Sequence, residues 1–142
     1  MSARKAKPKF VLDSYAILTY LKEEAGWQKV RDIIWDAYKR KASLFINYVN
    51  LGEIYYIIYR EHGAVTADRI TSMIKQWPIS FVSVKESLAI IAGRVKAENK
   101  LSYADAYVVA TALTKRSTVI TGDQEFKPLE EIIDIHWLPK NR

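Results

Sequence analysis

Five short apolar segments, separated by longer helical ones, most restrict what this chain can fold into. They occupy residues 10–13, 43–47, 79–84, 118–121 and 133–136. Most of them lack the apolar–polar alternation of a half-exposed strand, so we expect strands that are buried on both faces. Parallel strands need crossover connections, which the intervening helical segments supply. The sequence therefore predicts an α/β fold with a central parallel sheet.

The connecting segments predict the helices and one domain. We expect helices at 14–24, 27–41, 50–63, 66–76, 85–100 and 102–116, and a short one at 124–131. A chain of 142 residues suits one core. We place a single domain at 10–142, after a basic N-terminal arm at 1–9. With no cysteine, no secretory signal and no apolar run near the roughly 20 residues of a membrane span, we expect a cytoplasmic protein without a membrane partner.

The charge of the chain favours a polyanionic partner. Lys and Arg number 22 against 16 Asp and Glu, which gives a net charge of +6. Three basic clusters stand out: Arg4, Lys5, Lys7 and Lys9; Lys39, Arg40 and Lys41; and Lys115 with Arg116. Taken singly, each cluster is also typical of a solvated tail or a helix end.

Four acidic residues are candidates for a functional site in such a fold. Asp13 and Asp123 follow predicted strands, and ligands of open parallel sheets bind beyond the carboxyl ends of the strands. Glu53 and Asp105 are the only charges in NLGEIYYIIY and LSYADAYVVATAL. Helical spacing puts Asp105 on the apolar face of its helix.

Helix capping is the alternative explanation for these acids. Asp13 and Asp123 suit N-caps, and Asn50-x-x-Glu53 and Ser102-x-x-Asp105 resemble capping boxes. A cap contributes about 1 kcal/mol, whereas two carboxylates about 5 Å apart repel by roughly 3 kcal/mol at an effective dielectric of 20. If the acids converge, they should therefore have raised pKa values or bind Mg²⁺ or Mn²⁺.

A zinc site is not expected. His62 and His136 lie far apart in the sequence, and no cysteine is present to join them. We interpret both histidines as ordinary surface or helix-end residues.

Four segments in order resemble one known family, the PIN-domain nucleases, and in particular the VapC-like toxins of toxin-antitoxin pairs. They are LDSYAIL at 12–18, NLGEIYY at 50–56, LSYADAYVVATA at 101–112 and TGDQEF at 121–126. The resemblance covers residues 10 to about 137. It implies a three-layer α/β/α domain with strand order 3-2-1-4-5 and an acidic pocket beyond strands one and four.

The resemblance also assigns roles to residues. Asp13, Glu53, Asp105 and Asp123 match the catalytic, metal-binding acids of the family, and Ser14 and Thr121 match hydroxyl positions that orient carboxylates or a metal-bound water. Asp13, Glu53 and Asp105 would chiefly hold a first ion, and Asp123 would complete that site or share a second ion. Ser14 stands where threonine is frequent, which keeps the hydroxyl.

The activity that the resemblance implies is Mg²⁺- or Mn²⁺-dependent endonucleolytic cleavage of RNA, which leaves a 5′-phosphate and a 3′-hydroxyl. It implies two protein partners: an antitoxin that lies across the groove with a basic side chain at the acidic pocket, and a second copy in a homodimer held by the early helices. Two alternatives stay open: a housekeeping RNA-processing nuclease, and a non-catalytic RNA-binding module. A dehalogenase-like phosphatase is disfavoured, because Tyr15 stands where its second aspartate belongs.

The aromatic residues on the predicted helices are Tyr55, Tyr56, Tyr59, Trp27 and Trp35. We expect them to pack in the core or to form a partner surface rather than to stack on RNA bases.

Overall fold

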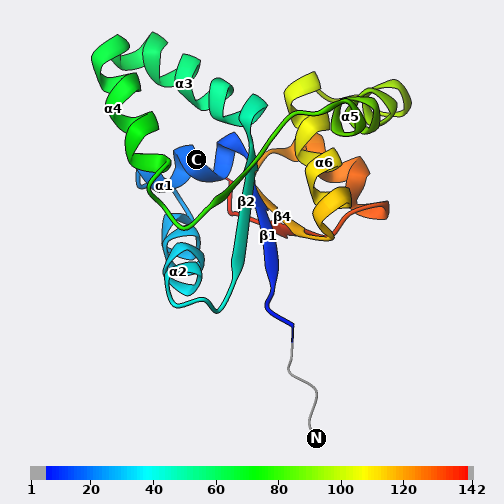
Figure 1. Cartoon of the computed structure of the whole chain (residues 1–142), viewed down its shortest axis with the longest axis horizontal. Coiled ribbons are helices and arrows are strands. Elements are labelled where there is room, and N and C mark those ends of the chain that lie inside the picture. Colours follow the sequence, from blue (N-terminus) through cyan, green and yellow to red (C-terminus); the bar gives the residue numbers. More distant parts are fainter. Residues whose placement is uncertain (1–5, 141–142) are drawn as a thin grey trace, which may run out of the picture.

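A computed structural model describes residues 6–140 (Figure 1). The strands are β1 (Lys9–Leu12), β2 (Ser43–Asn47), β3 (Ser80–Val82), β4 (Thr118–Thr121) and β5 (Ile135–Trp137). The helices are α1 (Ser14–Leu21), α2 (Trp27–Tyr38), α3 (Tyr48–His62), α4 (Ala64–Ile74), α5 (Glu86–Glu98), α6 (Tyr103–Lys115) and the 3₁₀ helix η1 (Gln124–Glu131). All strand pairs are parallel and the order is β3-β2-β1-β4-β5, which confirms the predicted fold class and strand order.

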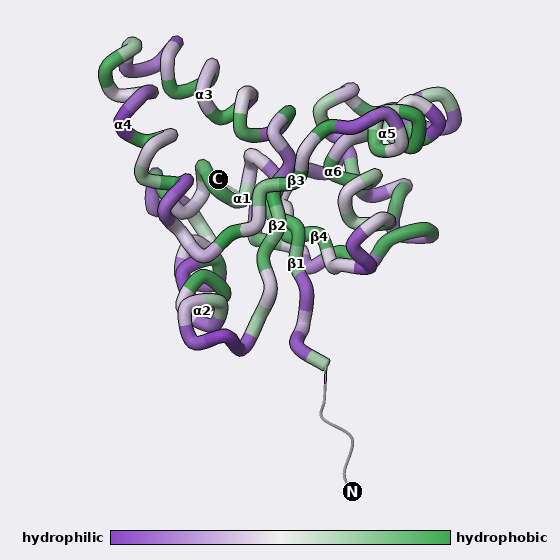
Figure 2. The backbone as a smooth tube through the Cα atoms, viewed as in Figure 1, coloured by the Kyte–Doolittle hydropathy of each residue, from purple (hydrophilic) through white to green (hydrophobic). Residues whose placement is uncertain are grey.

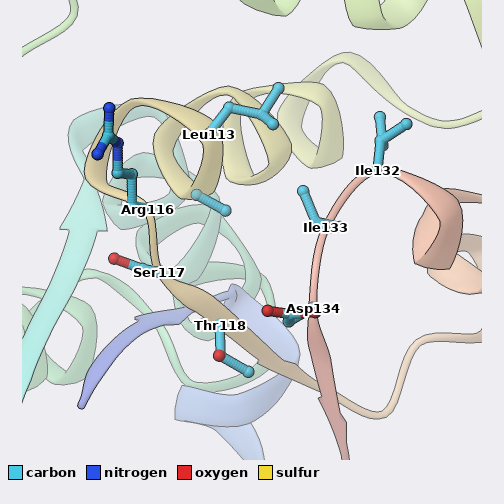
Figure 3. A pocket seen from close by; sticks show the side chains of 8 residues that line it. Leu113, Arg116, Ser117, Thr118, Ile132, Ile133 and Asp134 are labelled. Atoms are coloured by element: carbon cyan, nitrogen blue, oxygen red, sulfur yellow. The ribbon is translucent and has the colours of Figure 1, made fainter.

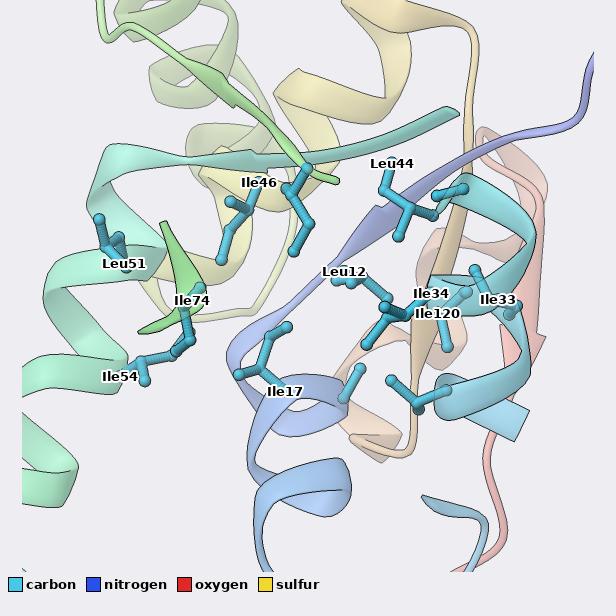
Figure 4. Close-up of a cluster of buried hydrophobic side chains, with 14 of the residues drawn as sticks. Leu12, Ile17, Ile33, Ile34, Leu44, Ile46, Leu51, Ile54, Ile74 and Ile120 are labelled. Carbon is cyan, nitrogen blue, oxygen red and sulfur yellow. The ribbon is translucent and has the colours of Figure 1, made fainter. Parts of the chain in front are cut away.

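The sheet separates two hydrophobic cores. Leu12, Leu44 and Ile120 point from the strands toward α1–α4, where they meet Ile17, Ile34 and Ile54 (Figure 4). Val11 and Val119 point the other way, toward α6 and η1, where they join Val108, Phe126 and Leu129. Because neighbouring strand residues enter opposite cores, the strands are apolar on both sides, as the green strands of Figure 2 show. Each fully buried side chain stabilises the fold by roughly 1.5–3 kcal/mol.

The ends of the elements differ from the predicted ones in a few places. The edge strands β3 and β5 have only three residues each, because each pairs on one side alone. Helix α3 begins at Tyr48, two residues before the predicted start, because Asn47 caps it. The predicted capping box that starts at Asn50 is therefore wrong.

Three further features bear on the predictions. Helix α5 packs chiefly on α6 and lies outside it, away from the sheet (Figure 1). Of the predicted N-terminal arm, residues 1–5 lie outside the described residues. None of the helices within residues 6–140 combines the length and the apolar character that a membrane crossing requires.

Candidate functional site

Asp13 follows β1 and is only 2% exposed. Its Oδ1 accepts a hydrogen bond of 2.8 Å from the backbone N–H of Ala16, so the residue caps α1. Its Oδ2 accepts a hydrogen bond from the Thr121 hydroxyl at the end of β4, the neighbouring strand. One carboxylate thus caps a helix and also faces the next strand end. The capping explanation and the site explanation are therefore compatible at this residue.

Thr121 connects two of the acidic positions. Besides donating to Asp13, its Oγ1 accepts a hydrogen bond of 3.0 Å from the backbone N–H of Asp123. Asp123 in turn caps η1, because its Oδ1 accepts from the backbone N–H of Glu125 at 2.9 Å. The buried threonine therefore fixes the backbone of Asp123 relative to the Asp13 carboxylate.

Glu53 reaches the site from α3. The Ser14 hydroxyl, in the first turn of α1, donates a hydrogen bond to Glu53 Oε1. Each of the two predicted hydroxyl residues thus donates to a predicted acid, Ser14 to Glu53 and Thr121 to Asp13.

Asp105 lies in the first turn of α6 and is 7% exposed. Ser102 caps this helix by accepting from the backbone N–H of Asp105 at 3.1 Å. Carboxylate oxygens of Asp105, Asp123 and Glu125 lie within 4.8 Å of one another. Within residues 6–140, these three acids form the one group whose spacing suits a metal ion; it contains Glu125, which is not among the predicted acids, and does not contain Asp13 or Glu53.

Glu125 is the acid that sequence reasoning missed. It stands two residues after Asp123 in the quoted segment TGDQEF, at the start of an amphipathic stretch that predicts a surface helix. The spacing itself was the available signal, because an N-cap and the residue two positions later lie in the same helical turn. The structure brings Glu125 beside Asp105, with which it shares a side-chain hydrogen bond.

The electrostatics of the site follow from burial and from mutual repulsion. Burial raises the pKa of Asp13 to about 7, and the negative charges of Asp123 and Glu53 add to this shift. Burial likewise raises the pKa of Asp105 to about 8, helped by the hydrogen bond to Glu125 and by the charges of Asp123 and Asp13. The predicted acids from four elements thus lie close enough for their charges to raise the pKa values of Asp13 and Asp105.

Such a donor set fits a hard divalent cation. At the 4.8 Å limit of the Asp105, Asp123 and Glu125 oxygens, two full charges repel by roughly 3 kcal/mol at an effective dielectric of 20. A cation between them reverses the sign of this energy. Oxygen donors alone, without histidine or thiolate, suit Mg²⁺ or Mn²⁺ rather than Zn²⁺.

A buried asparagine positions two of the acid-bearing helices. Asn47 is fully buried at the end of β2, and its Oδ1 caps α3 by accepting from the Asn50 backbone N–H at 2.9 Å. Its Nδ2 donates at 3.1 Å to both the Tyr107 carbonyl and the Thr111 hydroxyl of α6. Asn50 adds a 3.2 Å bond from its Nδ2 to the Ala104 carbonyl, next to Asp105. These bonds set the position of α6 against α3, and so of Asp105 relative to Glu53.

Gly122 keeps the space for the Tyr15 ring. A Cβ at this position would lie 2.3 Å from Cε1 of Tyr15, which is closer than side chains can approach. The absence of a side chain at Gly122 therefore lets the Tyr15 ring lie against the backbone at this position.

Other predicted residues lie away from the acids. His62 ends α3 and is exposed, as predicted, whereas His136 lies in the edge strand β5 and is partly exposed, so it is near the surface but not at a helix end. Tyr56, Tyr59 and Trp35 are exposed rather than packed in the core. Of the two roles expected for these rings, their exposure favours a partner surface over core packing.

The family model described as PIN domain matches residues 10–132. No curated protein sequence matches the chain.

Several solved structures share the fold at low sequence identity. VapBC2 from Rickettsia felis, bound to a promoter DNA fragment, has a TM-score of 0.71 at 12% identity, covering 92% of this chain and 99% of that one. DNA-bound VapBC from Salmonella typhimurium gives 0.71 at 17%, covering 91% and 97%. Mycobacterium tuberculosis VapC20, described as a sarcin-ricin loop cleaving toxin, gives 0.67 at 16%, covering 84% and 94%.

Proposed function

Because this chain belongs to the PIN domain family, we propose that it is a divalent-metal-dependent endoribonuclease, the toxin of a toxin-antitoxin pair. We propose that residues 10–142 form its single domain and that it acts in the cytoplasm, where its RNA substrate is found. The observation that carries the proposal is the convergence of mutually repelling carboxylates from four elements beyond the ends of β1 and β4.

Asp13, Glu53, Asp105 and Asp123 would hold Mg²⁺ or Mn²⁺. When bound, such an ion polarises the scissile phosphate and lowers the pKa of a bound water. The protein's own contribution is orientation: the Thr121 and Ser14 hydroxyls restrict the rotation of the Asp13 and Glu53 carboxylates. Asp13 and Asp105 must lose their protons before they can bind an ion, so the raised pKa values make metal binding release protons.

The test of this function is cleavage of RNA by the purified chain with Mg²⁺, with Mn²⁺ and with EDTA. We expect cleavage with either ion, none in EDTA, and products that carry a 5′-phosphate and a 3′-hydroxyl. Cleavage that persists in EDTA and leaves a cyclic phosphate would contradict the proposal, because such products come from attack by the RNA's own 2′-hydroxyl.

Glu125 is proposed as a fifth carboxylate of the site. We expect Glu125→Gln to weaken Mn²⁺ binding and to slow cleavage by about tenfold, less than loss of a buried acid, because Glu125 is exposed. Calorimetric titration with Mn²⁺ and cleavage rates measure both effects. Glu131→Gln is the matched control, since this exposed glutamate ends the same 3₁₀ helix. Equal effects of the two substitutions would exclude a local role for Glu125.

An aromatic groove supports the proposed protein partner. Tyr20 and Trp77 contact each other edge to face and separate two adjoining pockets of about 350 and 300 Å³. Trp35 and Tyr38, each 56% exposed, form one end of the groove. Exposed aromatic groups gathered in this way are typical of protein interfaces. We propose that an antitoxin covers this groove, and that the chain also forms a homodimer.

A further inference from the structure

The three basic clusters of the sequence precede three neighbouring strands. Lys7 and Lys9 lead into β1, Lys39–Lys41 into β2, and Lys115 and Arg116 into β4. These strands are adjacent and parallel, with Lys9 paired to Ser43 and Phe10 to Thr118. The clusters therefore lie side by side at the amino ends of the strands, about 4.8 Å per strand apart. We call these cations the basic edge: Lys7, Lys9, Lys39, Arg40, Lys41, Lys115 and Arg116.

The basic edge lies opposite the acidic site. Asp13 follows Lys9 by four residues of extended chain, so the two edges are about 13 Å apart along β1. Figure 2 shows hydrophilic residues along the turn between α2 and β2 and at the start of β1. The sheet thus carries negative charge at one end of its strands and positive charge at the other.

The cations of the basic edge are available to a ligand. Among the residues from 6 to 140, none of the seven forms an ion pair. Six of them are exposed, and Lys115 lies half-buried with its Nζ 5.5 Å from the centre of the Phe45 ring. Two carboxylates lie near this edge: Asp36 lines a pocket with Lys39, and Asp134 lines another with Arg116. Asp134 lines a pocket of about 260 Å³ with Arg116, Ser117 and Thr118 (Figure 3).

Two cations of the basic edge have an unusual backbone conformation. Arg40 and Arg116 follow the ends of α2 and α6 in the left-handed conformation, with φ of 59° and 50°. Glycine is the usual residue at such helix ends, because it adopts this conformation without strain. Both arginines therefore stand at the basic edge despite a conformational cost, a cost that Glu23 after α1 shares.

We propose that the basic edge binds the phosphate backbone of the RNA substrate while the acidic site at the opposite edge cuts it. This inference rests on the proposed function. A metal ion at the acidic site would attract only the phosphate that is cut, so attraction for the rest of the polyanion requires another surface. A row of exposed cations at strand spacing matches a chain of phosphates, which needs point charges and no buried apolar contact.

The test compares RNA binding by variants in the Asp13→Asn background, where the RNA is not expected to be cut. Arg40→Gly combined with Arg116→Gly removes two cations and relaxes two left-handed positions. We expect the slope of log K against log salt to fall by about 1.4 for single-stranded RNA, and binding in about 0.1 M salt to weaken at least tenfold. The melting temperature should change by only a few degrees, since relief of strain opposes the greater freedom of glycine in the unfolded chain.

Two controls isolate the basic edge. Glu23→Gly relaxes the third left-handed position, with φ of 51° after α1, without removing a cation, and should not weaken binding. Arg69→Gln combined with Arg94→Gln removes two exposed cations from α4 and α5, and should change the slope by less than half as much.

The outcomes separate this inference from the proposed function. If the parent chain cuts RNA with metal but the Arg40→Gly, Arg116→Gly variant binds with unchanged slope and affinity, the basic edge is wrong and the nuclease stands. An equal loss in the Arg69→Gln, Arg94→Gln control would also overturn it, as would preference of the edge for an acidic peptide over RNA. If the parent neither binds nor cuts RNA, both proposals fail.

Discussion

Asp13→Asn is expected to lower the rate of metal-dependent RNA cleavage by at least about 10²–10³-fold while the protein stays folded. The substitution removes one charge at the position where the β1 end meets the β4 end. It keeps an oxygen that can accept from the Ala16 N–H, and asparagine caps helices about as well as aspartate. A pure capping role therefore predicts an active variant, and a metal-binding role predicts an inactive one.

Cleavage rates and a thermal melt of the same preparation decide between these roles. Asp32→Asn is the matched control, because it makes the same chemical change at an exposed position on α2. Cleavage at the parental rate by folded Asp13→Asn would remove Asp13 from the site. An unfolded variant would instead assign the residue to stability, and Asp105→Asn would then carry the test of catalysis.

The second large effect is a fall in the stability of the metal-free protein as pH rises. The folded-state pKa of Asp13, about 7, lies above the ordinary value of 3.8, so between these values the folded chain binds a proton that the unfolded chain has lost. The free energy of unfolding therefore decreases as pH rises from about 4 to 7, and at neutral pH the cost approaches roughly 4 kcal/mol for this group. Asp105, with a pKa of about 8, changes stability in the same direction.

Melting temperatures in EDTA from pH 5 to 8.5 measure this fall, and Asp13→Asn should flatten it. Added Mn²⁺ should act in the opposite direction: the rise in melting temperature that it causes should increase with pH, because the ion binds the deprotonated carboxylates of the native state only. A rise that is independent of pH, or equal in the parent and in Asp13→Asn, would contradict a metal site at these residues.

The central strands could be predicted from the sequence alone, whereas the edge strands β3 and β5 could be predicted less well. The apolar runs at 43–47 and 118–121 match β2 and β4 to the residue, because both strands pair on two sides and are buried on both faces. The runs at 79–84 and 133–136 form strands of three residues, since an edge strand extends only as far as its one partner. The strand order came from the family resemblance, because apolar periodicity does not say which strands are neighbours.

Likewise, some residues of the candidate site could be predicted from the sequence and others could not. Asp13 and Asp123 could be found because a strand end in a parallel sheet is a known location for ligands. Asn47 could not, because its partners Tyr107 and Thr111 lie 60 and 64 residues away and only the packing of α6 on α3 reveals them. Glu125 is not among the predicted site residues, because an acid at the start of a short amphipathic segment is typical of a solvated surface. The roles of all these residues stay predictions until the variants are measured.

Helix α5 packs on α6 rather than on the sheet, so it is a suitable place to attach a fluorescent label. The chain contains no cysteine, so one introduced thiol is chemically unique. Ile90 on α5 is 59% exposed, and a dye coupled to a cysteine there would be separated by a whole helix from the strands that bear both charged edges. Energy transfer from such a label to a fluorescent RNA would then show the path of the bound RNA, and the label would touch neither the acidic site nor the basic edge.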